Sequence, residues 1–163
     1  GDVYKRQVYA NEPVRFLGVS SITNSLGAND PELGDRTTDG GKEYVFVYNT
    51  GSSTANVGHC CIVSAVSNYS VTVSSVTNTD QAIGVVVHSG LATGDYGWLL
   101  TRGFAEVEMS PDNSAAVAQM LNLGPDGGFA QVSNTTGQAS PYFAKAMEAM
   151  ASGASGTAYV SIL

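Results

Sequence analysis

Three residues that could bind a metal or carry redox chemistry stand side by side in this chain: His59, Cys60 and Cys61. A structural zinc site needs spaced ligands that converge on a tetrahedron. The sequence offers no second pair to complete one, since its other histidine is His88. Neighbouring cysteines rarely bond to each other because the geometry is strained. We therefore interpret both cysteines as small buried strand residues and predict no metal and no cofactor.

Paired carboxylates could perform acid–base chemistry. Glu106 and Glu108 lie two positions apart on a predicted strand, so both point to one face, and two carboxylates at a suitable separation hydrolyse glycosides. Adjacent acids on a half-exposed strand are more often simply solvated. A Ser-His-Asp triad stays open because serines are abundant, but the sequence has no Gly-x-Ser-x-Gly nucleophile turn and no Gly-x-x-x-x-Gly-Lys phosphate loop. We predict that the chain is not an enzyme.

A stretch rich in Gly, Asn and Thr carries four acidic residues that could contribute oxygen ligands to calcium: Asp30, Glu32, Asp35 and Asp39. Their spacing is not that of a helix–loop–helix calcium site. We expect these carboxylates to be solvated loop residues.

Two aromatic residues, Tyr96 and Trp98, flank Gly97 at the end of a predicted hairpin. If they are exposed, they would form a sugar-binding platform or an anchor in a protein interface. If they are buried, they pack the core, which is the usual place for the single tryptophan of a small β domain. The sequence favours core packing and leaves the other alternative open.

The overall charge narrows the range of partners. The formal net charge is −7, and the only adjacent basic pair is Lys5-Arg6. A nucleic-acid binder needs a positive surface that displaces counterions, so we predict no nucleic-acid partner. No apolar run reaches the ~20 residues that cross a bilayer, so we predict no membrane partner.

The apolar pattern predicts an all-β fold. Residues 43–49 are apolar on both faces, which indicates a central strand. Further strands are expected at 59–65, 69–73, 83–88, 98–101 and 104–109, with a bulge or bend at Gly103 between the last two. In the second part of the chain, Ser110 and Pro111 look like a helix start, so residues 114–121 could form a short helix. Strands are expected again at 129–132 and 158–162.

A segment of the sequence occurs twice. Residues 89–101 and 148–160 share Ala, Gly and Gly at a constant spacing: Ala92 with Ala151, Gly94 with Gly153, and Gly97 with Gly156. Each copy passes from an apolar stretch through a small-residue turn into a second apolar stretch, the pattern of a β-hairpin. The repeat also places residues 142–150, which have high helix propensity, opposite a predicted strand. We therefore predict strand there, and a small β-barrel or β-tulip-like sandwich with a two-fold internal repeat.

The N-terminal residues differ in character from the rest of the chain. Residues 2–7 look like translated adapter sequence, so we expect residues 1–7 to be adapter-derived or non-native. Residues 8–41 look irregular, and residues 24–41 are too polar to make a core of their own, so we expect an extended N-terminal arm or a long surface loop over 8–41. Residues 42–109 and 110–163 are then the first and second β halves of one compact domain, 42–163.

Several motifs resemble a known family. The segments Leu33-Gly-Asp-Arg36 and Asp39-Gly-Gly-Lys-Glu-Tyr-Val-Phe-Val-Tyr-Asn49 are similar to the opening of small structural proteins of tailed phages. Ala82-Ile-Gly-Val-Val86, Gly94-Asp-Tyr-Gly-Trp98, Leu121-Asn-Leu-Gly-Pro-Asp-Gly-Gly128 and the closing Val160-Ser-Ile-Leu163 continue the pattern. The whole resembles head-decoration (capsid-cement) proteins. One departure is Phe143-Ala-Lys145, where those proteins often have Gly-Val-Ala.

The resemblance implies a non-enzymatic virion protein that decorates and stabilises the outer surface of a phage capsid. Its partners would be the major capsid protein and copies of itself in a homotrimer. The residues expected to make contacts come from the arm and the hairpin: Phe16, Leu17, Leu33, Arg36, Tyr96 and Trp98. The alternative reading is a receptor- or carbohydrate-binding module of a tail fibre or cell-surface adhesin.

Overall fold

The computed structural model describes residues 17–65, 69–74, 81–131 and 143–162. The fold is all-β, with 49% of residues in strands and 2% helical, the latter being one 3₁₀ turn at Pro125–Gly127. The strands are β1 (Ile22–Thr23), β2 (Arg36–Asp39), β3 (Lys42–Asn49), β4 (Cys60–Ala65), β5 (Ser70–Val73), β6 (Ala82–Val85), β7 (Tyr96–Glu108), β8 (Met120–Leu123), β9 (Phe129–Gln131), β10 (Ala144–Ala146) and β11 (Ser155–Ser161). Among the described residues, no helix has the length and apolarity to cross a membrane.

Five strands close a first barrel. They follow one another in the order β3, β5, β4, β6 and β7, and the ring closes because β3 also pairs with β7 in antiparallel fashion. Alternate residues point inward along each strand, so Val45 and Val47 of β3 meet Cys61, Val71 and Leu99 in one buried cluster. The central strand predicted at residues 43–49 is therefore present as β3. The barrel alternative of the predicted fold class is therefore confirmed.

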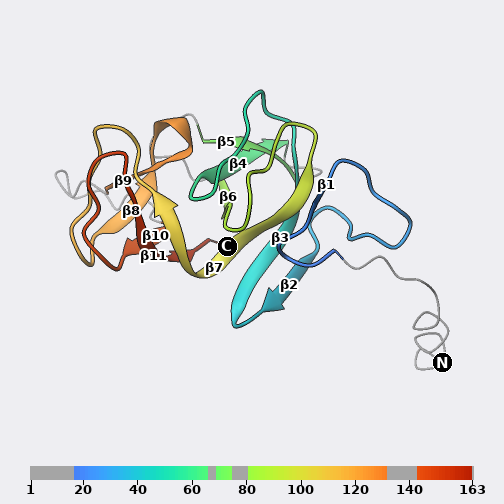
Figure 1. Ribbon diagram of the computed structural model, residues 1–163, viewed down its shortest axis with the longest axis horizontal. Coiled ribbons are helices and arrows are strands. Elements are labelled where there is room, and N and C mark those ends of the chain that lie inside the picture. The colour runs from blue at the N-terminus through green and yellow to red at the C-terminus, as the bar shows by residue number, and fades with distance from the viewer. Residues whose placement is uncertain (1–16, 66–68, 75–80, 132–142, 163) are drawn as a thin grey trace.

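A second barrel follows the first. Residues 104–108 of β7 pair with β11, β11 with β10, β10 with β8, and β8 with β9. A parallel bridge between Met109 and Phe129 closes the ring. The strand β7 is therefore shared, because its first half belongs to one barrel and its second half to the other. Figure 1 shows the two barrels side by side, with β7 passing between them.

The two barrels repeat the same pairings, which confirms the internal repeat. Cys60 faces Val85 in the first barrel as Met120 faces Lys145 in the second. Each hairpin turn contains a glycine with positive φ, +87° at Gly94 and +68° at Gly153, a conformation that side chains disfavour. Three further pairs correspond between the barrels. Val47 faces Gly97 as Val107 faces Gly156, and Asn49 faces Val71 as Met109 faces Phe129. Ala55 bridges to Leu91 as Ala115 bridges to Met150.

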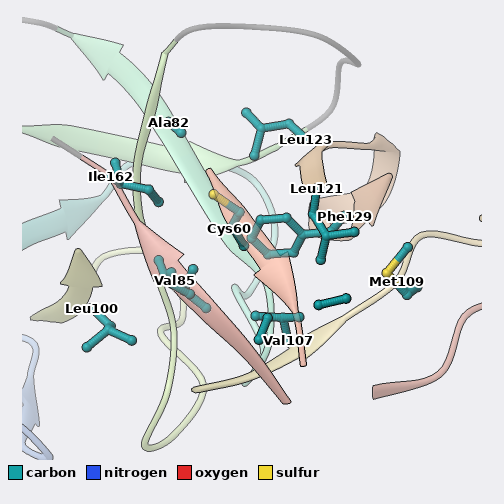
Figure 2. Close-up of a cluster of buried hydrophobic side chains, with 14 of the residues drawn as sticks. Cys60, Ala82, Val85, Leu100, Val107, Met109, Leu121, Leu123, Phe129 and Ile162 are labelled. Carbon is teal, nitrogen blue, oxygen red and sulfur yellow. The ribbon is translucent and has the colours of Figure 1, made fainter. Parts of the chain in front are cut away.

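The two barrels share one continuous core. Cys60, Val85 and Leu100 point outward from the first barrel and belong to the same buried cluster as Phe129 and Ile162 of the second. Figure 2 shows the side chains of both barrels gathered in this cluster. Because neither barrel can expose its part of the cluster without loss of apolar burial, we expect the two barrels to unfold together.

Two predictions for the second half are resolved by the fold. The expected short helix at residues 114–121 is wrong: Ala115 bridges to Met150, a tight turn follows, and β8 begins at Met120. The same turn occurs at residues 56–59 of the first barrel, so pairing with the hairpin overrides the local helix signal. The strand prediction for residues 142–150 is confirmed at Ala144–Ala146, although Tyr142 lies outside the described residues.

Candidate functional site: an aromatic face, a cleft and an open strand edge

Four aromatic side chains share the outer face of the first barrel. Phe46 faces Trp98, and Tyr48 faces Tyr96, across the β3–β7 ladder. Residues directly opposite each other in antiparallel strands lie on the same face. The ring centroids of Phe46 and Trp98 are 5.1 Å apart, and those of Tyr48 and Tyr96 are 4.4 Å apart. This aromatic face would be too apolar to leave uncovered.

Residues 17–39 cover the aromatic face. The Trp98 Nε1–H donates to the Leu17 carbonyl oxygen at 3.2 Å, and β1 pairs with β7 at Ile22 and Gly97. The backbone N–H of Gly34 donates to the Phe46 carbonyl at 2.9 Å. Phe46 is consequently fully buried, and Trp98 is half-buried. Trp98 therefore packs against the buried cluster on one side and stays partly exposed on the other, between the two interpretations made from the sequence.

Between the covering segment and the barrel lies a cleft of about 520 Å³. Leu17, Val19 and Trp98 contribute its apolar wall, and residues 29–31 and 35–39 contribute its polar wall. Arg36 is exposed on this wall. The cleft thus combines an aromatic ring with carboxylate, amide and guanidinium groups.

Strand β2 borders the cleft and has an open edge. Within the described residues, β2 pairs only with β3. The Phe46 N–H donates to the Asp35 carbonyl at 2.9 Å, which makes these two residues a hydrogen-bonded pair. Because hydrogen-bonded and non-bonded pairs alternate in an antiparallel ladder, Arg36 and Thr38 direct their N–H and C=O groups away from β3. These groups can accept a further strand.

The structure places the predicted contact residues in different environments. It brings Leu17, Arg36 and Trp98 together at the cleft, where Leu17 is buried and Arg36 is exposed. Leu33 is half-buried in the turn before β2, and Tyr96 is half-buried against Tyr48. Phe16 lies outside the described residues. The open edge of β2 was not predicted, because the polar sequence Arg-Thr-Thr-Asp carries no apolar alternation.

The acidic residues of the covering segment shape its turns. The Gly27 N–H donates to Asp30 Oδ2 at 2.6 Å, and the Glu32 N–H donates to Asp35 Oδ2 at 2.9 Å. Asp and Asn commonly stabilise turns by such bonds to nearby backbone. No group of three or more His, Cys, Asp or Glu residues suited to a metal ion occurs in the part of the chain that the structure describes.

His59 and Glu108 lie where the two barrels meet. His59 Nε2 is 3.5 Å from Glu108 Oε1, and the Glu108 N–H donates to the Gly58 carbonyl at 3.1 Å. His59 Nδ1 accepts a hydrogen bond from the Asn56 N–H, which leaves Nε2 facing the carboxylate. Glu106 is exposed on the same face of β7 as Glu108. The pair joins the turn before β4 to the second barrel.

The two cysteines are buried and free. Cys61 points into the first barrel, and Cys60 points into the cluster shared by both barrels. Burial raises the pKa of Cys61 to about 12 and that of Cys60 well above its usual range. Both therefore stay protonated at neutral pH, and a protonated buried thiol is a poor nucleophile.

Comparison with known proteins gives one structural likeness to report. No protein-family model matches this chain, and no curated protein matches it. Among solved structures, the chain is similar to the N-terminal base of the head fibre protein gp8.5 of bacteriophage phi29. The identity is 16% and the TM-score 0.48, over 72% of this chain and 92% of that one. A likeness of this degree leaves the function to be argued from the residues themselves.

Proposed function

We propose that this chain is a non-enzymatic structural protein of a tailed-phage virion, located on the capsid surface. It decorates and stabilises the capsid by binding the major capsid protein, and it associates with itself as a homotrimer. The motifs that resemble head-decoration proteins support this proposal. In the structure, the first of them forms the turn into β2, and the second forms β3. The phi29 protein also belongs to a phage head, but the proposal does not rest on that likeness.

The observation that carries the proposal is the open edge of β2 beside the cleft. An added strand gains backbone hydrogen bonds along such an edge, and a neighbouring pocket accepts an anchoring side chain. Here the outward groups of Arg36 and Thr38 supply the edge, and the cleft floored by Trp98 supplies the pocket. Natural proteins usually protect an exposed edge from aggregation by charged residues and short length. β2 has both, with four residues and two charges.

Stabilisation of a capsid follows from mass action. A protein that binds the assembled lattice and not its separate subunits shifts the equilibrium toward the assembled state. Two barrels that share one core form a rigid body suited to this task. The reactive groups singled out from the sequence take part in packing: the thiols are buried, and His59 bridges the barrels.

The proposal is tested by blocking the open edge. Thr38→Pro removes the outward N–H and leaves the bonds between β2 and β3 in place, whereas the matched control Thr38→Ala keeps that N–H. Heads stripped of this protein are incubated with each purified full-length variant, and bound protein is quantified after sedimentation. We expect the wild type and Thr38→Ala to bind in a fixed ratio to the major capsid protein. We expect Thr38→Pro to bind at least about tenfold more weakly, since a specific interface usually depends on a few critical contacts.

Two results would contradict the proposal. If wild-type protein does not bind heads, the decorating role is wrong. If Thr38→Pro binds like Thr38→Ala, the role of the β2 edge is wrong.

The composition of the cleft favours a second candidate function. An aromatic ring beside carboxylate, amide and guanidinium groups suits a sugar, which is apolar on its ring faces and polar at its rim. A glycan array separates the two functions. Specific glycan binding that is lost in Arg36→Ala, together with only a few copies per virion, would favour a receptor- or carbohydrate-binding module.

A further inference from the structure

Large apolar side chains gather on the outside of the second barrel. Of the seven large hydrophobic residues that are exposed in the described part of the chain, five belong to this barrel: Phe104, Val117, Met120, Met147 and Tyr159. Phe104 is 52% exposed and Val117 63% exposed. An apolar group of this kind on one face of a soluble protein usually marks an interaction site.

Four exposed residues form a continuous row across this face. Phe104 of β7 is opposite Tyr159 of β11, Tyr159 is opposite Lys145 of β10, and Lys145 is opposite Met120 of β8. Directly opposite residues share one face of a sheet. The Phe104 and Tyr159 rings make an edge contact, with centroids 5.0 Å apart and planes at 71°. We call these four residues the outer row.

The first barrel has an equivalent row. Tyr44 is opposite Leu100, Leu100 is opposite Val85, and Val85 is opposite Cys60, in the same order of strands. None of these residues is more than 3% exposed. They belong to the buried cluster that contains Phe129 and Ile162 of the second barrel (Figure 2). The same face of the same unit is therefore covered by a neighbouring barrel in one case and uncovered in the other.

The outer row carries one basic residue among its apolar ones. The chain has seven Lys and Arg residues against fourteen Asp and Glu. Lys145 lies within the row. Arg102, two residues before Phe104 on β7, is 3.9 Å from Glu43, and Glu106, two residues after Phe104, is exposed on the same face. The Lys42 side chain lies beside Gly103, between these positions. Lys145 at the centre of the row can pair with a carboxylate of another copy of this chain, which carries twice as many acidic as basic residues.

We infer that the outer row is a self-association surface that docks on a second copy of this chain. The second copy takes the place that the second barrel takes against the first barrel. Phe104 and Tyr159 are the aromatic anchors, Met120 extends the apolar contact, and Lys145 meets an acidic group of the neighbouring copy. This inference deepens the proposed function, which includes self-association, but the contact itself is argued from the two equivalent rows.

The test is sedimentation velocity of the full-length chain over a range of concentrations, without capsids. The wild type should associate, and the double variant Phe104→Thr/Tyr159→Thr should raise the apparent dissociation constant at least about tenfold, because central aromatic residues dominate interface affinity. The matched control is Val57→Thr, which replaces an exposed valine of the first barrel outside the row and should leave association unchanged. Circular dichroism confirms that each variant is folded.

The second variant is Met120→Lys at the other end of the row, which should weaken association even if the double variant does not fold. The inference is overturned if the wild type is monomeric throughout, or if folded row variants associate like the wild type. Binding to heads is measured separately on the same proteins. Wild type that associates but does not bind heads would contradict the proposed function and leave the outer row standing. A monomer whose row is protected only on heads would show that the row contacts the capsid instead.

Discussion

The two barrels have the same strand pairings and different outer faces. Inside, equivalent positions are apolar in both: Val71 in the first barrel corresponds to Phe129 in the second, and both are fully buried. Outside, Phe46 and Trp98 of the first barrel correspond to Glu106 and Thr157 of the second. Residues 17–39 cover the aromatic pair, and the polar pair is exposed. The interior thus maintains the fold, and each outer face is free to be used for a different contact.

The largest expected effect tests whether the barrels are one cooperative unit. Phe129→Ala removes a fully buried ring from the second barrel, and we expect it to lower the free energy of unfolding by about 3–5 kcal/mol. The single tryptophan, Trp98, reports on the first barrel. In urea titrations, the Trp98 fluorescence midpoint should fall together with the circular dichroism midpoint. An unchanged fluorescence midpoint would mean that the first barrel is stable alone.

The second prediction concerns the two buried thiols of β4. Burial holds the pKa of Cys61 at about 12, above its ordinary value of 9.0, and raises the pKa of Cys60 in the same direction. The folded state therefore keeps both protons when the unfolded state begins to lose them. The thiols leave stability unchanged well below pH 9 and lower it as pH rises from 9 toward 12, by about 1.4 kcal/mol for Cys61 at pH 10. Cys60 adds to the loss in the same direction.

Denaturant titrations at pH 7 and pH 10 check this prediction. The variant Cys60→Ala/Cys61→Ala is the control, and its stability should fall less between the two pH values. In the native wild type, both thiols should react with a thiol reagent only after denaturant is added. An equal alkaline loss in wild type and control would show that other groups are responsible.

The repeat made much of the fold predictable. Residues 43–49 are apolar on both faces because Val45 and Val47 fill the first barrel while Tyr44 and Phe46 are covered from outside. The alternation after Gly103 was also predicted correctly, with Val107 buried and Glu106 exposed. Local signals failed where long-range pairing decides, as at residues 114–121, which pair with the hairpin instead of forming a helix.

The surfaces were less predictable than the strands. Leu17 and Trp98 were singled out, but their cleft depends on a covering segment whose path no local pattern reveals. Phe104 and Tyr159 share their strand faces with polar residues, Glu106 on β7 and Thr157 on β11, so the alternation itself places them outside. The alternation does not reveal that the equivalent face of the first barrel is covered, and this becomes visible only when the two barrels are compared. Sequence reports which residues are apolar, whereas the number of neighbouring barrels determines which of them are covered.

The smallest expected effect comes from comparing one pair of equivalent positions, a covered residue of the first barrel and an uncovered residue of the second. Tyr44 is 3% exposed in the first barrel, and Phe104 is 52% exposed in the second. Tyr44→Thr should lower the free energy of unfolding by about 2–4 kcal/mol, because it leaves a cavity in the shared cluster. Phe104→Thr should change it by no more than about 0.5 kcal/mol, since substitutions on exposed strand faces seldom matter to folding. Both values come from urea titrations at a protein concentration where the chain is monomeric. A loss of several kcal/mol in Phe104→Thr would mean that Phe104 is covered within its own chain, and the outer row would then not be available to a second copy.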